Sequence, residues 1–194
     1  MIKMIFYHAS DIEGLRKILP LSESKNKEEK DKVAYFTTIR VCALSFLRDK
    51  EVNHVIIGVG NDNVLECTEF FHDQLRTMYQ GRSGYLYTCE NNGSITVAQA
   101  AHIWSSKEPV NVIETEYIDN VYDHIMQEIT TKNLRYISYE SLSEKTKHEN
   151  TINMKNFILE RNLLTVNSAQ SRFWEKYYPE AWKMAITENT DKSK

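Results

Sequence analysis

The stretch FYHAS at residues 6–10, followed by AYFTT at residues 34–38, indicates how this chain begins to fold. Both stretches are short, rich in aromatic residues and bounded by polar ones, a pattern typical of β-strands. The charged run between them, residues 25–32, offers no apolar side chain for burial. We therefore expect two neighbouring strands joined by an exposed loop, which is placed to act as a lid.

Outside these strands, the pattern predicts a single α+β domain. Further strands are expected at 54–59, 84–89, 109–117 and briefly at 134–139, with helices at 39–47 and 70–79. From Ile118 the apolar period changes to that of a helix, through Ile125 and Ile129. We expect a β core over residues 1–118, a helical flank of the same domain over 119–186 and a polar tail over 187–194.

Composition excludes several classes of protein. The 194 residues are 41% hydrophobic and carry a formal net charge of −3, so a nucleic-acid contact would need a local patch, such as the aromatic and basic residues between 172 and 183. No apolar run is long enough to span a membrane and the N-terminus runs directly into a strand, so we expect a cytoplasmic protein. Three cysteines without a C-x-x-C pair and six histidines without ligand spacing indicate neither disulfides nor a metal.

In chain order, four motifs resemble the ADP-ribosyltransferase superfamily. They are FYHAS at 6–10, AYFTT at 34–38, GYLY at 84–87 and SSKEPVNV at 105–112. The small bacterial rifampin ADP-ribosyltransferases are the most similar group, since they carry Tyr-His-Gly-Thr, Ile-Tyr-Phe-Thr, Ile-Tyr and Arg-Glu-Pro-Leu strands in the same order. The resemblance covers about residues 5–118. It implies a split, mainly antiparallel β core with flanking helices.

The resemblance also implies roles for particular side chains. His8 matches the histidine that hydrogen-bonds a ribose hydroxyl of NAD, and Ser10 matches a hydroxylated residue on the nicotinamide side. Tyr35 matches the tyrosine that stacks on the nicotinamide ring, with Phe36 and Thr37 completing the cofactor-binding stretch. A neutral imidazole suits a ribose hydroxyl, and an aromatic face suits a flat cation. We therefore expect His8 and Tyr35 to face one cleft.

The catalytic carboxylate of this family has three candidates. Glu114 and Glu116 form a Glu-Thr-Glu strand similar to that of one transferase clade, and Glu90 follows the GYLYTC strand. Glu116 is the first choice and Glu90 the reserve, while Glu114 is better explained as a solvated strand residue. The family's glycine after the histidine is Ala9 here, which adds a methyl group next to the cofactor.

These motifs predict an NAD-dependent mono-ADP-ribosyltransferase with catalytic residues Glu116, His8 and Tyr35. Its acceptor would be a macromolecule or a small molecule, as in a toxin or a phage-conflict protein. NAD is then a substrate and no metal is required. The alternative is an inactive module of the same fold that binds a nucleotide-like ligand or a protein partner. A 2′-phosphotransferase is disfavoured because the additional basic residues it needs are not found around the pocket.

Overall fold

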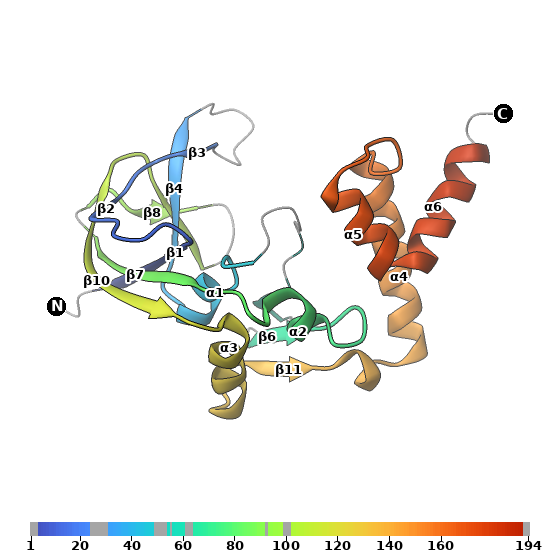
Figure 1. The fold of residues 1–194 in the computed structure, drawn as a ribbon, viewed down its shortest axis with the longest axis horizontal. Helices are drawn as coiled ribbons and strands as arrows, with labels where there is room; N and C mark the ends of the chain where they lie inside the picture. Colours follow the sequence, from blue (N-terminus) through green and yellow to red (C-terminus); the bar gives the residue numbers. More distant parts are fainter. Residues whose placement is uncertain are drawn as a thin grey trace.

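The structure is a computed structural model that describes residues 4–23, 31–48, 54, 56–60, 64–91, 93–98 and 102–191. Over these residues the protein is α+β, with a large antiparallel sheet, a small second sheet and helices that follow mainly in the second half (Figure 1). The predicted α+β class is confirmed. Residues 25–30 of the expected lid lie outside the described residues.

The main sheet has the strand order β2-β10-β7-β1-β4-β9-β8, with β3 paired to β4. Its strands are β1 (Ile5–Ser10), β2 (Lys17–Ile18), β3 (Ser22–Glu23), β4 (Lys32–Thr37), β7 (Gly84–Glu90), β8 (Thr96–Val97), β9 (Ile103–Ser106) and β10 (Val110–Ile118). β1 pairs with β7 along its whole length, and meets β4 at Tyr7 and Thr37. Figure 1 shows β4 running across the direction of β1 and β7, so the sheet turns sharply at this junction.

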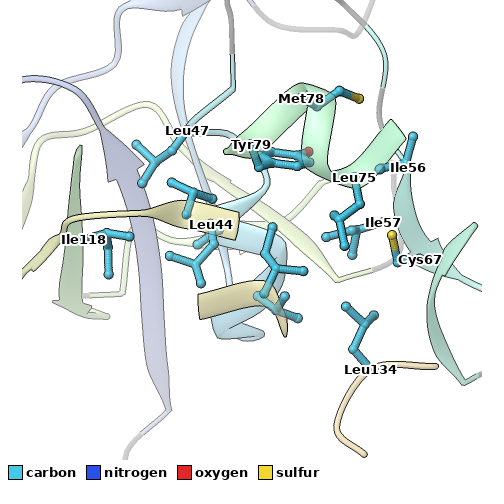
Figure 2. Packing of buried hydrophobic residues seen from close by; sticks show 14 of the residues in the cluster. Leu44, Leu47, Ile56, Ile57, Cys67, Leu75, Met78, Tyr79, Ile118 and Leu134 are labelled. Carbon is cyan, nitrogen blue, oxygen red and sulfur yellow. The ribbon is translucent and has the colours of Figure 1, made fainter. Parts of the chain in front are cut away.

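A second, three-stranded sheet forms from β5 (Ile57–Val59), β6 (Leu65–Thr68) and β11 (Arg135–Ile137), where β11 lies parallel to β6. Helices α1 (Arg40–Leu44), α2 (Gln74–Tyr79) and α3 (Val121–Thr130) complete this half of the fold. Their apolar faces meet one face of the main sheet in a shared core, which includes Leu44, Leu75, Tyr79 and Ile118 (Figure 2). Burial of these side chains is the main stabilising term that holds α1 and α3 against the sheet.

Gly84 allows a close approach at the start of β7. A Cβ atom there would lie 2.6 Å from Leu47 Cδ2 and 3.0 Å from the Ser10 carbonyl oxygen. Any larger residue would therefore push the turn after α1 away from the sheet. The glycine fixes the end of β1, and with it the position of Ser10.

The C-terminal helices pack around a core of their own. After a 3-10 turn at Tyr139–Ser141, α4 (Glu144–Glu160), α5 (Ala169–Tyr177) and α6 (Pro179–Asp191) surround a cluster that contains Ile158, Phe173 and Trp174. Trp174 is only 1% exposed, so it packs in the core and is not available to stack on a nucleic-acid base. None of the helices within the described ranges is long and apolar enough to cross a membrane.

Two predicted boundaries were wrong. The helix expected from Ile118 begins at Val121, because β10 continues to Ile118 in register with Gly84. The polar tail expected from residue 187 is helical to Asp191, since α6 continues through it. The short strand expected at 134–139 is confirmed, because β11 joins the second sheet there.

Candidate functional site

The alternation of side chains along β1 divides the predicted site residues between two faces of the main sheet. Phe6 and His8 point to one face, which packs with Phe36 and Tyr87 and is called the aromatic face here. The intervening Tyr7 and Ala9 point to the opposite face, which α1 and α3 cover and which is called the helical face. Membership of one face or the other decides which predicted residues can meet a common ligand.

His8 is held in one orientation by its neighbours. Its Nδ1 lies 2.9 Å from the backbone carbonyl oxygen of Tyr35, and its ring centroid is 5.8 Å from that of Phe36. A carbonyl can only accept, so Nδ1 carries the proton and Nε2 is left as an acceptor. Burial lowers the pKa of His8, and the hydrogen bond to Tyr35 opposes this shift only in part. The ring is therefore neutral near pH 7.

Tyr35 does not face the same cleft as His8, so this prediction was wrong. Side chains alternate along β4, so Tyr35 lies on the side opposite Phe36, whose ring is the one 5.8 Å from the ring of His8. Tyr35 therefore points away from the aromatic face, and its hydroxyl donates to the carbonyl of Glu23 at 3.3 Å. It contributes its backbone carbonyl to the His8 site, and its ring is not placed to stack on a ligand at His8.

Phe36 and Thr37 were expected to contact a cofactor, and the structure buries both. Each side chain is 2% exposed. Phe36 fills the core beneath the aromatic face, and the Thr37 hydroxyl accepts from the Ile39 backbone N–H at the start of α1. Their roles are packing and capping, so the prediction of direct cofactor contacts is not supported at these two positions.

Ser10 shares the aromatic face with His8. The register of the sheet places Ser10 across from Tyr85 of β7, and Tyr85 across from Tyr117 of β10. The Ser10 hydroxyl accepts from the Ile12 backbone N–H at 3.2 Å, which begins the turn after β1. His8 and Ser10 are the two predicted cofactor-binding residues that the structure brings together.

Glu116 lies on the helical face and is held by a cation. Its Oε1 is 2.6 Å from Arg40 Nη2, and Arg40 also approaches Glu128 at 3.5 Å and His124 Nδ1 at 3.3 Å. These groups line a polar cavity of about 320 Å³, together with Gln127, Thr131 and Asn133. Because two carboxylates surround one guanidinium, Arg40 is neutralised and the cavity is not an anion site.

The other two carboxylate candidates also lie away from His8. Glu114 pairs in register with Thr88, and Glu90 with Ile5, so both belong to the rows of the helical face. All three predicted carboxylates thus lie on the face opposite the histidine that they were expected to assist. The sequence could not show this, because the face of β10 depends on an irregularity between Val112 and Glu114.

The structure adds one carboxylate to the aromatic face that the sequence reasoning missed. Glu13, in the segment after β1, lies near the hydroxyl of Tyr85. Partial desolvation and this carboxylate raise the pKa of the Tyr85 hydroxyl. The same segment is fixed to the sheet by the Tyr87 hydroxyl, which donates to the carbonyl of Ile12. The sequence did not indicate that Glu13 would lie near Tyr85, because Glu13 belongs to a loop without a regular pattern.

Neither the cysteines nor the acidic residues suggest another centre of chemistry. Burial raises the pKa of Cys67 and of Cys89 to about 12, so these thiols are inert. Among the residues with described positions, no three His, Cys, Asp or Glu side chains are grouped to hold a metal ion. Comparison of the chain with protein-family models, curated proteins and solved structures found no match.

Proposed function

We propose that this protein binds an NAD-like dinucleotide on the aromatic face, as a module of the ADP-ribosyltransferase type. The observation that carries the proposal is the state of the His8 ring. Its Nδ1–H donates to the Tyr35 carbonyl, and among the described residues none hydrogen-bonds its Nε2. A neutral, oriented imidazole with one acceptor nitrogen suits a ribose hydroxyl.

Two further features support the same ligand. Ser10 lies two residues from His8 on the same face, so its hydroxyl and the imidazole can contact one small molecule. The four motifs with which these residues occur resemble the ADP-ribosyltransferase superfamily in their order along the chain. The split of the sheet at β1 and β4 is also what that resemblance implies.

The geometry favours binding over catalysis through Glu116. In an ADP-ribosyl transfer, the bond between the nicotinamide nitrogen and ribose C1′ breaks, nicotinamide leaves with the bonding electrons, and the acceptor atom bonds to C1′ as it loses its proton. A carboxylate assists by stabilising the cationic ribose. Glu116 is on the opposite face of the sheet and is paired with Arg40, so it is not placed for this role.

ADP-ribosyl transfer remains a second candidate because of Glu13. This carboxylate lies near Tyr85, which shares the aromatic face with His8, and contributes to the raised pKa of the Tyr85 hydroxyl. Transfer would then depend on Glu13, with His8 and Ser10 holding the nucleotide. Release of nicotinamide from NAD by the wild type, and its loss in Glu13→Gln, would support turnover. NAD binding without any release would identify a binding module.

Calorimetric titration with NAD tests the proposal. We expect the wild type to bind, and His8→Ala to weaken binding by about 5- to 150-fold, the equivalent of about 1–3 kcal/mol for a lost buried hydrogen bond. His148→Ala is the matched control, because His148 is exposed on α4, and it should bind as the wild type does. Thermal unfolding of each variant separates loss of binding from loss of fold. Absence of binding by the folded wild type would refute the proposal.

A further inference from the structure

Strand β10 forms one margin of the main sheet over most of its length. β2, the outermost strand in the sheet order, pairs only with Val110 and Asn111, and the Val112 N–H donates to the Arg16 carbonyl oxygen just beyond them. Over residues 113–117, no described part of the chain pairs with the edge of β10 that faces away from β7. Figure 1 shows β10 next to β7 at the margin of the sheet and leading into α3.

This edge has the regular geometry that a further strand requires. Residues 114–118 pair with β7 in continuous register, because the irregularity of β10 lies between Val112 and Glu114. Alternate residues direct their N–H and C=O groups to opposite edges of a strand, so about half of these groups face away from β7. Ile113 and Tyr117 are 56% and 59% exposed, so their side chains are open to a partner. An edge of this kind can accept an added strand.

The two faces of β10 differ in chemistry along this edge. Glu114 and Glu116 lie in the rows of the helical face, whereas Thr115 and Tyr117 lie in the rows of the aromatic face. Glu114 is exposed, and no described cation pairs with its carboxylate. A docked strand would alternate in the same way, with every second side chain next to carboxylates and the others next to a methyl group and an aromatic ring. This pattern fits a segment in which basic residues alternate with apolar ones.

The polar cavity next to Glu116 adds to the negative character of this margin. The Glu116 and Glu128 carboxylates lie 2.6 Å and 3.5 Å from the Arg40 guanidinium, so two carboxylates share one guanidinium in its lining. A basic side chain across from Glu116 would therefore meet a surplus of negative charge.

A second copy of this chain fits the edge less well. The overlap that uses the whole exposed stretch is an antiparallel pair of β10 strands centred on Thr115. It would place Glu114 of each copy across from Glu116 of the other, and like charges directly opposite each other destabilise a sheet. The acidic row therefore opposes self-pairing and favours a partner of opposite charge.

We propose that the edge of β10 over residues 113–117 binds an extended basic segment of another protein as an added strand. Backbone hydrogen bonds to the edge provide affinity, and Glu114 and Glu116 select basic side chains at alternate positions. The site does not depend on nucleotide binding at His8, because β7 separates β10 from β1.

The test is fluorescence anisotropy with a labelled synthetic peptide in which lysine alternates with valine. We expect the wild type to bind it, and Glu114→Lys to weaken binding about tenfold through charge repulsion. Glu175→Lys makes the same charge change at an exposed position on α5 and is the matched control, with an expected change of less than about twofold. Thermal unfolding of both variants shows that they fold.

Modified peptides test the strand pairing on the unaltered protein. Methylation of alternate backbone nitrogens keeps the charge but blocks the hydrogen bonds of one edge, so this peptide should lose binding, as should a peptide with glutamate in place of lysine. No binding of the lysine–valine peptide by the wild type, equal binding of the methylated peptide, or unchanged binding by Glu114→Lys would each overturn the proposal. A wild type that sediments as a dimer, and is tightened by Glu114→Lys, would assign the edge to a second copy instead.

Discussion

His8 and His54 are two half-buried histidines whose surroundings differ. Burial lowers the pKa of both, to about 4 for His54, where the positive charge of Arg48 adds to the effect. His54 Nδ1 accepts from the Tyr178 hydroxyl at 2.7 Å and from Gln74 Nε2 at 3.0 Å. His8 instead donates from Nδ1 to a backbone carbonyl.

The comparison shows how the proposed binding residue differs from a structural one. The His54 ring lies within 5.7 Å, between centroids, of the rings of Phe70, Trp174 and Tyr178, and links the C-terminal helices to α2. Both histidines have a lowered pKa, so this shift does not show which of them contacts a ligand. The difference lies in the direction of the hydrogen bonds and in what covers the ring.

The largest effect expected from this comparison is on stability. His54→Ala removes the ring that Gln74 and Tyr178 contact and leaves a cavity, so it should lower the free energy of unfolding by about 3 kcal/mol. NAD affinity should be unchanged. Urea unfolding measures the first and calorimetry the second, with His148→Ala as the control. A loss below about 1 kcal/mol would mean that the packing of the C-terminal helices against α2 does not depend on His54.

A smaller change in the free energy of unfolding is expected when the pH is lowered. The pKa of His54 is about 4 in the folded protein, below its ordinary value near 6.5, so the unfolded chain binds more protons between these values. Stability is therefore lost as pH falls from 6.5 toward 4, by about 2 kcal/mol between pH 6.5 and 5. His54→Asn does not titrate and should show a correspondingly shallower fall. Equal pH dependence in the two proteins would contradict this assignment.

Substitutions on the helical face are expected to have the smallest effects on stability and on NAD affinity. Glu116 is half-exposed in its ion pair with Arg40, and such pairs contribute about 0–1 kcal/mol. Glu116→Gln should therefore cost less than about 1 kcal/mol and leave NAD affinity within twofold of the wild type. If transfer occurs, nicotinamide release should also persist in this variant. A loss of turnover by orders of magnitude at full affinity would restore Glu116 as the catalytic carboxylate.

The sequence predicted the strands but not the face that each side chain occupies. FYHAS and AYFTT form adjoining strands, as expected, because their residue types suit a half-buried sheet. A shift of one residue in register moves every side chain to the other face, and no local pattern fixed the register between β1 and β4. Tyr35 was misplaced for this reason.

Other features of the structure were not predicted because they depend on contacts between residues that are distant in the sequence. Glu116 is paired with Arg40, 76 positions earlier in the chain, and Glu13 meets Tyr85 only after β1 and β7 have paired. β11 joins β6 as a parallel strand across a long connection. The alternating tyrosines in GYLY did mark two positions on one face, since Tyr85 lies across from Ser10 and Tyr87 across from His8.

Long-range proton–nitrogen NMR of the histidine rings tests the central claim most directly, with His54 as an internal control. The account predicts that free His8 carries its proton on Nδ1, and that the His8 Nε2 resonance shifts on addition of NAD while both His54 nitrogens stay in place. A proton on Nε2 of His8, or NAD binding that leaves the His8 ring unchanged, would contradict the claim that this nitrogen receives the ligand's ribose.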